Sequence, residues 1–172
     1  MAKLPIITAP DPRLKVKAKP VGTVDDETRR LMDDMLESMY AAPGIGLAAP
    51  QVGVARRVIV LDISPSEGER QPLRIADPEI VWVSDDDVVY EEGCLSVPEH
   101  YADVVRPNAV KVRCRDYDNN LIEIDAEGLL ATCLQHEMDH LEGILFIDHL
   151  SRLKRDMVLK KLEKARRARK AA

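Results

Sequence analysis

The sequence lacks the features that mark membrane-spanning, secreted and disulfide-bonded proteins. No apolar run among its 172 residues approaches the ~18–20 residues of a membrane span, so no membrane partner is expected. The first residues, Met1 to Pro5, contain no long apolar segment of the kind that a secretory signal requires. The three cysteines are odd in number and irregularly spaced, which indicates free thiols in a reducing compartment. The cytoplasm is therefore the expected location.

The chain also lacks internal repeats and a recognisable linker between domains. A length of 172 residues is most simply one domain, residues 1–172, and is large enough to bury a sizeable core. Hydrophobic residues make up 45% and charged residues 32%, which is ordinary for a soluble globular protein. Composition thus bounds the class of protein without naming its chemistry.

Charge is distributed unevenly behind a formal net charge of −5. Residues 151–172 contain ten Lys or Arg and two acidic residues, whereas residues 1–150 contain 15 basic and 28 acidic residues. A basic tail on an acidic body can bind a polyanion such as RNA. The alternative is a solvated helix whose charges keep the chain in solution, and both interpretations stay open.

The most informative motif is His-Glu-x-x-His at residues 136–140. On a helix, two histidines four residues apart lie on one face, roughly 5–6 Å from each other, so both imidazoles reach one metal ion. Glu137 is then held just outside the ligands, where it can take a proton from a metal-bound water. The surrounding leucines predict a half-buried helix, and buried imidazoles and carboxylates need partners. A metal is favoured over the alternative, a solvated helix face.

Residue patterns predict an α+β protein with strands before the main helix. Thr23 to Asp26 resembles a capping box that opens a first helix, whose methionines recur at helical spacing as core filler. The metal-binding helix is expected to end at Gly143. Expected helices run to about residue 41, over 127–142 and over 151–169, and expected strands lie near 57–63, 73–76, 79–83, 86–92, 110–115 and 121–126. The fold is therefore antiparallel or mixed sheets around a central metal-binding helix, with an N-terminal and a C-terminal helix.

Two histidines do not complete a zinc or iron site, so a third ligand must come from elsewhere. Cys94 follows a glycine at the end of an expected strand, and Cys133 shares the helix face with His136. If Cys94 alone joins the histidines, the fourth position holds water and the site is catalytic. If Cys133 joins as well, the site is a closed structural zinc. Cys114 is interpreted as inert packing.

Three segments together resemble the signature motifs of bacterial peptide deformylase. They are Gly44-Ile45-Gly46-Leu47-Ala48-Ala49-Pro50-Gln51, Glu92-Gly93-Cys94-Leu95-Ser96 and His136-Glu137-Met138-Asp139-His140, in the family's order and approximate spacing. The resemblance covers nearly the whole chain. It implies removal of the formyl group from the N-terminal formylmethionine of new polypeptides, with release of formate.

The resemblance also implies a role for individual residues. Cys94, His136 and His140 would bind one Fe²⁺ per chain, with Zn²⁺ or Ni²⁺ able to occupy the same site. Glu137 would take the proton of the attacking water and deliver it to the departing amine. The side-chain amide of Gln51 and the backbone N–H of Leu95 would stabilise the oxyanion.

By the same resemblance, the peptide substrate pairs with the backbone as an added strand. The residues along it would be Gly44, Ile45, Gly46 and Gly93, and the methionine pocket would be lined by Tyr90, Leu129, Thr132, Cys133 and His136. Tyr90 and Thr132 stand where the family commonly has an aliphatic residue. The basic C-terminal helix would contact the ribosome surface.

Two other classes of protein remain as alternatives. A metalloprotease with the same histidine motif would cleave internal peptide bonds. A noncatalytic zinc-stabilised binding module would have a closed site and would act through its basic tail.

Overall fold

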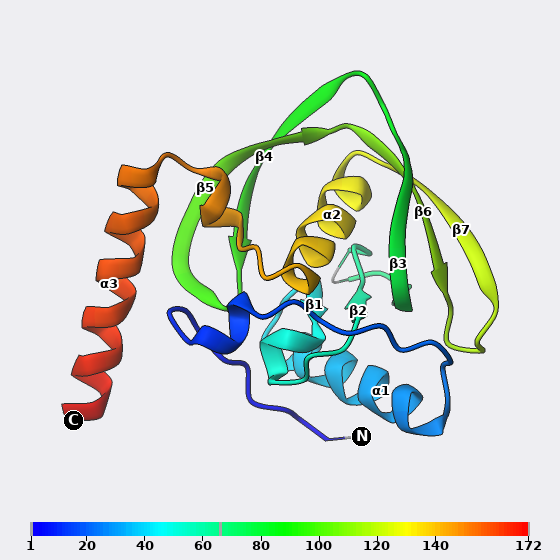
Figure 1. Cartoon of the computed structure of the whole chain (residues 1–172), viewed down its shortest axis with the longest axis horizontal. Coiled ribbons are helices and arrows are strands. Elements are labelled where there is room, and N and C mark those ends of the chain that lie inside the picture. The colour runs from blue at the N-terminus through cyan, green and yellow to red at the C-terminus, as the bar shows by residue number, and fades with distance from the viewer. Residues whose placement is uncertain (1, 66, 172) are drawn as a thin grey trace.

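Two antiparallel sheets enclose helix α2 (Leu129–Leu141), while α1 (Asp26–Ala41) and α3 (Arg152–Ala171) lie outside them (Figure 1). The computed structural model describes residues 2–65 and 67–171. Met1, Ser66 and Ala172, which belong to the expected 1–172 domain, lie outside the described residues. The α+β class and the central position of α2 confirm the fold expected from the sequence.

The larger sheet has the strand order β1-β2-β3-β6-β7, with every neighbouring pair antiparallel. Its strands are β1 (Gly46–Ala48), β2 (Val58–Leu61), β3 (Leu73–Val83), β6 (Ala109–Arg115) and β7 (Leu121–Glu127). The smaller sheet is a hairpin of β4 (Asp87–Cys94) and β5 (Val97–Pro107). Because β1 is an edge strand, one of its sides faces away from the sheet.

The structure differs from the expected strands in two places. The segments near 73–76 and 79–83 form one strand, because Asp77 takes a positive φ of 51° and pairing with β6 resumes at Glu79. Neither β5 nor β1 was expected. Two prolines and several charged residues obscure the strand pattern of β5, and the three residues of β1 are not β-branched.

Helix α2 is the centre of the fold, and ten of its 13 residues are buried. It packs against β1, β2, β5 and β7. Gly143 follows its C-terminus with a φ of 75°, and a β-carbon there would collide with the backbone of Lys15. The predicted stop at Gly143 is therefore confirmed. So much burial means that every polar side chain on α2 needs a specific partner.

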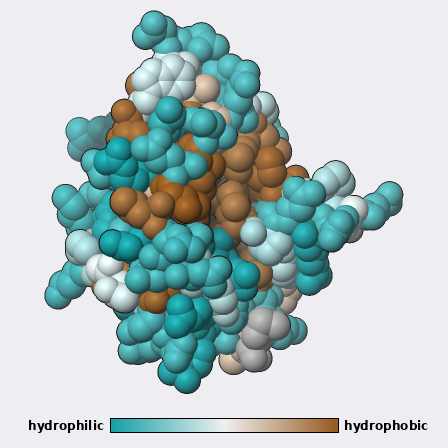
Figure 2. Space-filling model, turned by 90° about the vertical axis from the view of Figure 1, so that its right-hand side faces the viewer, coloured by the Kyte–Doolittle hydropathy of each residue, from teal (hydrophilic) through white to brown (hydrophobic). Residues whose placement is uncertain are grey.

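The core around α2 extends toward the surface through partly buried hydrophobic residues, namely Leu73, Ile122, Ile124 and Leu130. On the face that is turned toward the viewer in Figure 2, apolar side chains gather at the centre and polar side chains surround them. Within residues 2–65 and 67–171, no helix combines the length and the apolar character that crossing a membrane would require.

Helix α1 begins two residues later than the sequence pattern indicates. Asp25, not Thr23, is the N-cap: its carboxylate accepts hydrogen bonds from the backbone N–H of Thr28 at 2.9 Å and from the Thr28 hydroxyl at 2.8 Å. The predicted methionine stripe is confirmed as core, because Met32, Met35 and Met39 have no exposed surface.

Helix α3 contacts the body over a shorter stretch than its apolar pattern predicts. Leu162 is buried and Val158 and Leu159 are partly buried, whereas Leu153 remains 72% and Met157 50% exposed. The helix extends away from the sheets (Figure 1), so its ends do not pack as its middle does.

The cap of α1 yields a direct comparison of two substitutions. Asp25→Ala removes the acceptor for the Thr28 N–H and is expected to lower the Tm by about 2–4 °C. Thr23→Ala, at the exposed position first expected to be the cap, should leave the Tm unchanged. Thermal unfolding followed by circular dichroism measures both. Equal Tm values for the two variants would show that Asp25 does not cap the helix.

Candidate active site

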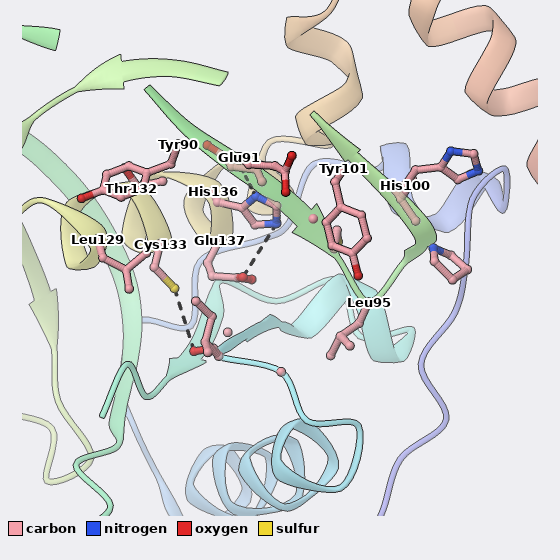
Figure 3. Close-up of a pocket in the computed structure, with 18 of the residues that line it drawn as sticks. Tyr90, Glu91, Leu95, His100, Tyr101, Leu129, Thr132, Cys133, His136 and Glu137 are labelled. Atoms are coloured by element: carbon pink, nitrogen blue, oxygen red, sulfur yellow. Dashed lines mark hydrogen bonds and ion pairs between the residues drawn. The ribbon is translucent and has the colours of Figure 1, made fainter. Parts of the chain in front are cut away.

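A cavity of about 440 Å³ opens where the β4–β5 hairpin, β1 and the pocket-facing side of α2 meet (Figure 3). Cys94, from the end of β4, and His136, from α2, line it, and His140, one turn further along α2, contacts Cys94 behind it. One ligand atom of each residue lies within 4.8 Å of the others, and Cys94 Sγ is 3.4 Å from His140 Nε2. In the described part of the chain, this is the one group of three or more Cys, His, Asp or Glu residues with such spacing.

This donor set fits a divalent metal ion. One thiolate and two imidazoles suit zinc, iron and nickel, and donors this close can all reach an ion at about 2.0–2.3 Å. His136 and His140 are 8% and 1% exposed, so they are held out of water where a metal is a natural partner. Cys133 does not join them, because its Sγ points toward the carbonyl oxygen of Ile45 at 3.9 Å. Cys114 is buried in the main core, as expected.

A buried ion-pair network orients His136. The Nδ1 atom of His136 lies 2.8 Å from Glu92 Oε1, and Arg106 donates to both carboxylate oxygens of Glu92 at 2.7 and 2.9 Å. Arg106 also donates to Asp139 Oδ2 at 2.9 Å. Burial raises the pKa of Glu92, but hydrogen bonds from His136 and Arg106 outweigh it and lower this pKa to about 2. The permanent carboxylate fixes the ring so that Nε2 faces the site.

Sequence reasoning missed this network. Glu92 stands inside one of the recognised motifs, two residues before Cys94, yet no separate role was predicted for it. Arg106 lies in the strand β5 that the sequence pattern did not reveal, so no signal pointed to it. Asp139 lies between the motif histidines and could have been found, because an acid on a buried helix needs a cation.

Glu137 lies beside the Cys94, His136 and His140 group and is not part of it. Its Oε1 atom is 3.9 Å from His136 Nε2, and Oε2 has no hydrogen-bond partner among the described residues. Burial raises its pKa to about 7. A β-carbon at Gly46 would lie 2.5 Å from Glu137 Oε1, so glycine at that position makes room for the carboxyl group.

The amide of Gln51 is held toward the cysteine. Its Oε1 accepts from the N–H of Ala48 at 2.9 Å, and its Nε2 donates to Ser96 Oγ at 3.0 Å and approaches Cys94 Sγ at 3.4 Å. Leu95 is the first residue of the two-residue turn between β4 and β5. Such a position contributes no bond to the hairpin ladder, which leaves its N–H available.

The edge of β1 beside the cavity is open. The Ile45 carbonyl accepts from Asp62 N at 2.8 Å, on the β2 side. The C=O of Ile45 and the N–H of Gly46 belong to the same trans peptide group and point in opposite directions. The N–H of Gly46 therefore points away from β2. Across the cavity, the ring of Tyr101 would lie 2.5 Å from a β-carbon at Gly93. These glycines keep the groove wide enough for an extended peptide backbone.

The remaining predicted pocket residues line one wall of the cavity. Leu129, Thr132 and Cys133 come from α2 and Tyr90 comes from β4 (Figure 3). Gly44 and Ile45, which directly precede β1, also line the cavity. Burial raises the pKa of Cys133 well above its usual value, which keeps the thiol neutral. The structure thus gathers every predicted site residue, except Gln51 and His140, into the lining of one cavity, and these two contact Cys94 behind it.

Comparison with known proteins agrees with this arrangement. The family model described as polypeptide deformylase matches residues 3–156. Peptide deformylase from Phenylobacterium zucineum is 60% identical over 168 residues, 98% of this chain and 99% of the relative. The crystal structure of peptide deformylase from Ehrlichia chaffeensis is 42% identical, covers 97% of this chain and 98% of its own, and superposes with a TM-score of 0.92. A second structure of the Ehrlichia enzyme, in complex with actinonin, has a TM-score of 0.91, with 44% identity over 96% of this chain and 98% of its own.

The histidine motif on a buried helix, the adjacent cysteine and the matched family lead to one conclusion. The chain belongs to the polypeptide deformylase family, metal-dependent hydrolases that remove the formyl group from the N-terminal formylmethionine of newly synthesised polypeptides.

Proposed function

We propose that this chain carries out deformylation at the base of the cavity, with Cys94, His136 and His140 as the metal ligands and the whole chain as one catalytic domain. The observation that carries the proposal is the Cys/His/His group, the one such group among the described residues. It lies beside Glu137, whose Oε2 atom has no hydrogen-bond partner among those residues. A divalent ion held by these residues would supply a Lewis acid at the formyl carbonyl and would lower the pKa of water. The resemblance to the family implies Fe²⁺ as the working ion, and Zn²⁺ or Ni²⁺ could occupy the same donor set.

Glu137 moves the proton. Its carboxylate accepts a proton from the attacking water and then gives it to the nitrogen of the departing amine. A buried carboxyl group beside the metal-binding side chains can serve both steps, because it accepts the proton in the first and returns it in the second. Its Oε2 atom has no competing hydrogen bond with any described residue.

Gln51 and Leu95 stabilise the negative charge that develops on the formyl oxygen. The Gln51 amide is oriented in advance by the bond from Ala48 N to its Oε1, so no reorganisation is needed during the reaction. The N–H of Leu95 comes from the adjoining turn. Loss of one such donor in other enzymes costs about 3–4 kcal/mol of barrier.

The substrate backbone pairs with the open edge of β1. Gly44, Ile45 and Gly46 line one side of the peptide and Gly93 the other, as in peptide binding by strand addition. The methionine side chain enters the part of the cavity that is lined by Tyr90, Leu129, Thr132, Cys133 and His136. A metalloprotease would instead cleave internal peptide bonds, and the family match favours deformylation over that activity.

We also propose that α3 contacts the ribosome surface, in the cytoplasm, where new polypeptides emerge. Ten of its residues are Lys or Arg, counting from residue 151. Five of them lie beyond the buried Leu162, namely Lys164, Arg166, Arg167, Arg169 and Lys170. Contact with RNA phosphates would be strongly salt-dependent.

Glu137→Gln is expected to retain the metal and to lose activity by about 10²–10⁴-fold, because an amide cannot accept the proton. Formate release from a formyl-Met peptide and metal content are measured on the same sample. Glu142→Gln makes the same change at the exposed end of α2 and is the control. A metal-loaded Glu137→Gln enzyme with wild-type turnover would remove Glu137 from the mechanism.

Glu92→Gln is expected to destabilise the metal-free fold at pH 7 by about 3–5 kcal/mol, because it breaks a buried ion pair. The pKa of Glu92 is depressed to about 2 from 4.5, so its stabilisation is present above pH 4.5 and is lost as the pH falls toward 2. The difference in the free energy of unfolding between wild type and Glu92→Gln, measured by urea unfolding, should therefore become smaller as the pH falls from 4.5 to about 2. Glu123→Gln, in an exposed pair with Arg113, is the control. If this difference in unfolding free energy stays constant from pH 7 to pH 2, the ionised Glu92 carboxylate does not provide the stabilisation.

Deletion from Ala165 onward is expected to preserve hydrolysis of a short formyl-Met peptide and to weaken ribosome association at low salt. The cut keeps Leu162, which docks the helix, and removes the distal basic residues. Co-sedimentation with ribosomes across a salt series measures the effect. Deletion from Leu153 should also destabilise the fold. If the shorter deletion sediments like the full chain at every salt concentration, α3 has no role in ribosome binding.

A further inference from the structure

The short helix η3 (Phe146–His149) follows α2 in the chain and contacts it at two points close to the metal-binding side chains. Phe146 is 1% exposed, and its ring stacks on the imidazole of His136, with ring centroids 6.1 Å apart and an interplanar angle of 24°. At the other end of η3, the Nε2 atom of His149 lies 2.9 Å from Oδ2 of Asp139. The proposed reaction uses neither Phe146 nor His149.

The contact made by His149 continues into the buried ion-pair network. The same Oδ2 atom of Asp139 accepts from Arg106 Nη1 at 2.9 Å. Arg106 in turn donates to Glu92, whose Oε1 lies 2.8 Å from Nδ1 of His136. An ionised carboxylate only accepts hydrogen bonds, so the Nε2 atom of His149 carries a proton and is the donor to Asp139. His149 is therefore the outermost member of a chain of contacts that ends on His136.

Side-chain hydrogen bonds hold η3 at both of its ends. Near its start, Oδ2 of Asp148 accepts from the N–H of Leu145 at 2.9 Å and also from Lys15, in the N-terminal arm. Within residues 2–65 and 67–171, the bond from His149 to Asp139 is the only side-chain hydrogen bond that joins η3 to α2. Its loss would leave the last residue of η3 free to move away from the histidine helix.

We propose that His149 is a positioning residue for the metal site. It holds the end of η3 against Asp139, which keeps the Phe146 ring on the face of His136 and supports the ion-pair network at the Nδ1 edge of that imidazole. A ring restrained at its face and at one edge has its Nε2 atom aimed in one direction, so less freedom is lost when a metal binds. The His149 side chain is 37% exposed and does not line the cavity, so it acts through these residues.

The inference rests on the proposed metal ligation, and the rate of metal loss tests it. The chain is loaded with Ni²⁺ and mixed with an excess of a chelator that changes colour when it binds the ion. Partners that orient a ligand typically change metal affinity by about 10–100-fold, and His149 acts one contact further away, so His149→Ala is expected to release Ni²⁺ about three- to tenfold faster than wild type. His149→Gln keeps an N–H donor at the end of the side chain and should stay within about twofold of wild type. Lys154→Ala, an exposed change on α3, is the control.

A second pair of variants locates the effect. If His149 acts through Asp139, the double variant His149→Ala/Asp139→Ala releases Ni²⁺ no faster than Asp139→Ala alone. Thermal unfolding of the metal-free chains verifies that each variant is folded, and the single His149 variants decide the test if Asp139→Ala is not.

Equal release rates in wild type and His149→Ala overturn the inference, even if the Tm of the variant is lower, because His149 then stabilises the fold alone. So does a His149→Gln chain that loses Ni²⁺ as fast as His149→Ala, or a double variant in which the two effects add. A wild-type chain that binds no Ni²⁺ overturns the proposed ligation, and the inference with it.

Discussion

Three buried side chains, Glu92, Arg106 and His136, form one ion-pair network with the partly buried Asp139 at the candidate metal site. Glu92 belongs to β4, Arg106 to β5, and His136 and Asp139 to α2, so the network joins the hairpin to the central helix. A buried guanidinium without a carboxylate partner would be strongly destabilising. The network therefore holds the end of β4, and Cys94 with it, against the two histidines.

The same packing decides the shape of the cavity. Helix α2 carries Glu137 on its pocket-facing side, and the backbone of β1 approaches that carboxyl group so closely that only glycine fits at position 46. The hairpin approaches from the other side, where Tyr101 covers Gly93. The outcome is a groove with an unpaired strand edge on one wall and an apolar pocket on the other, which matches an extended peptide with one buried side chain.

Much of the site could be predicted from the sequence, because its elements carry strong local signals. Histidines four residues apart on an apolar helix indicate a shared ligand, and Cys94 stands at a strand end beside a glycine. The choice between Cys94 alone and Cys94 with Cys133 could not be made from spacing. It depends on the direction of the Cys133 side chain, which points to Ile45 across the cavity.

The parts of the fold that escaped prediction depend on contacts distant in sequence. Strand β5 contains prolines and charged residues, and it exists because β4 pairs with it and because Arg106 meets Glu92. Strand β1 is too short to show a period and is defined by pairing with β2. The α1 cap is a different, local case: the Asp25 carboxylate, three residues before Thr28, accepts the Thr28 N–H, and the capping pattern that begins at Thr23 did not reveal this.

The central claim is that the Cys94, His136 and His140 group holds one metal ion that deformylation requires. It is tested most directly by preparing the wild-type chain anaerobically, removing metal with a chelator and restoring Fe²⁺, Zn²⁺ or Ni²⁺ in steps. Bound metal and formate release from a formyl-Met peptide are then measured on each sample. The account predicts that activity rises in proportion to bound metal, saturates at one ion per chain and is highest with Fe²⁺. Full activity in the metal-free chain, or an unchanged metal content in Cys94→Ala, would contradict it.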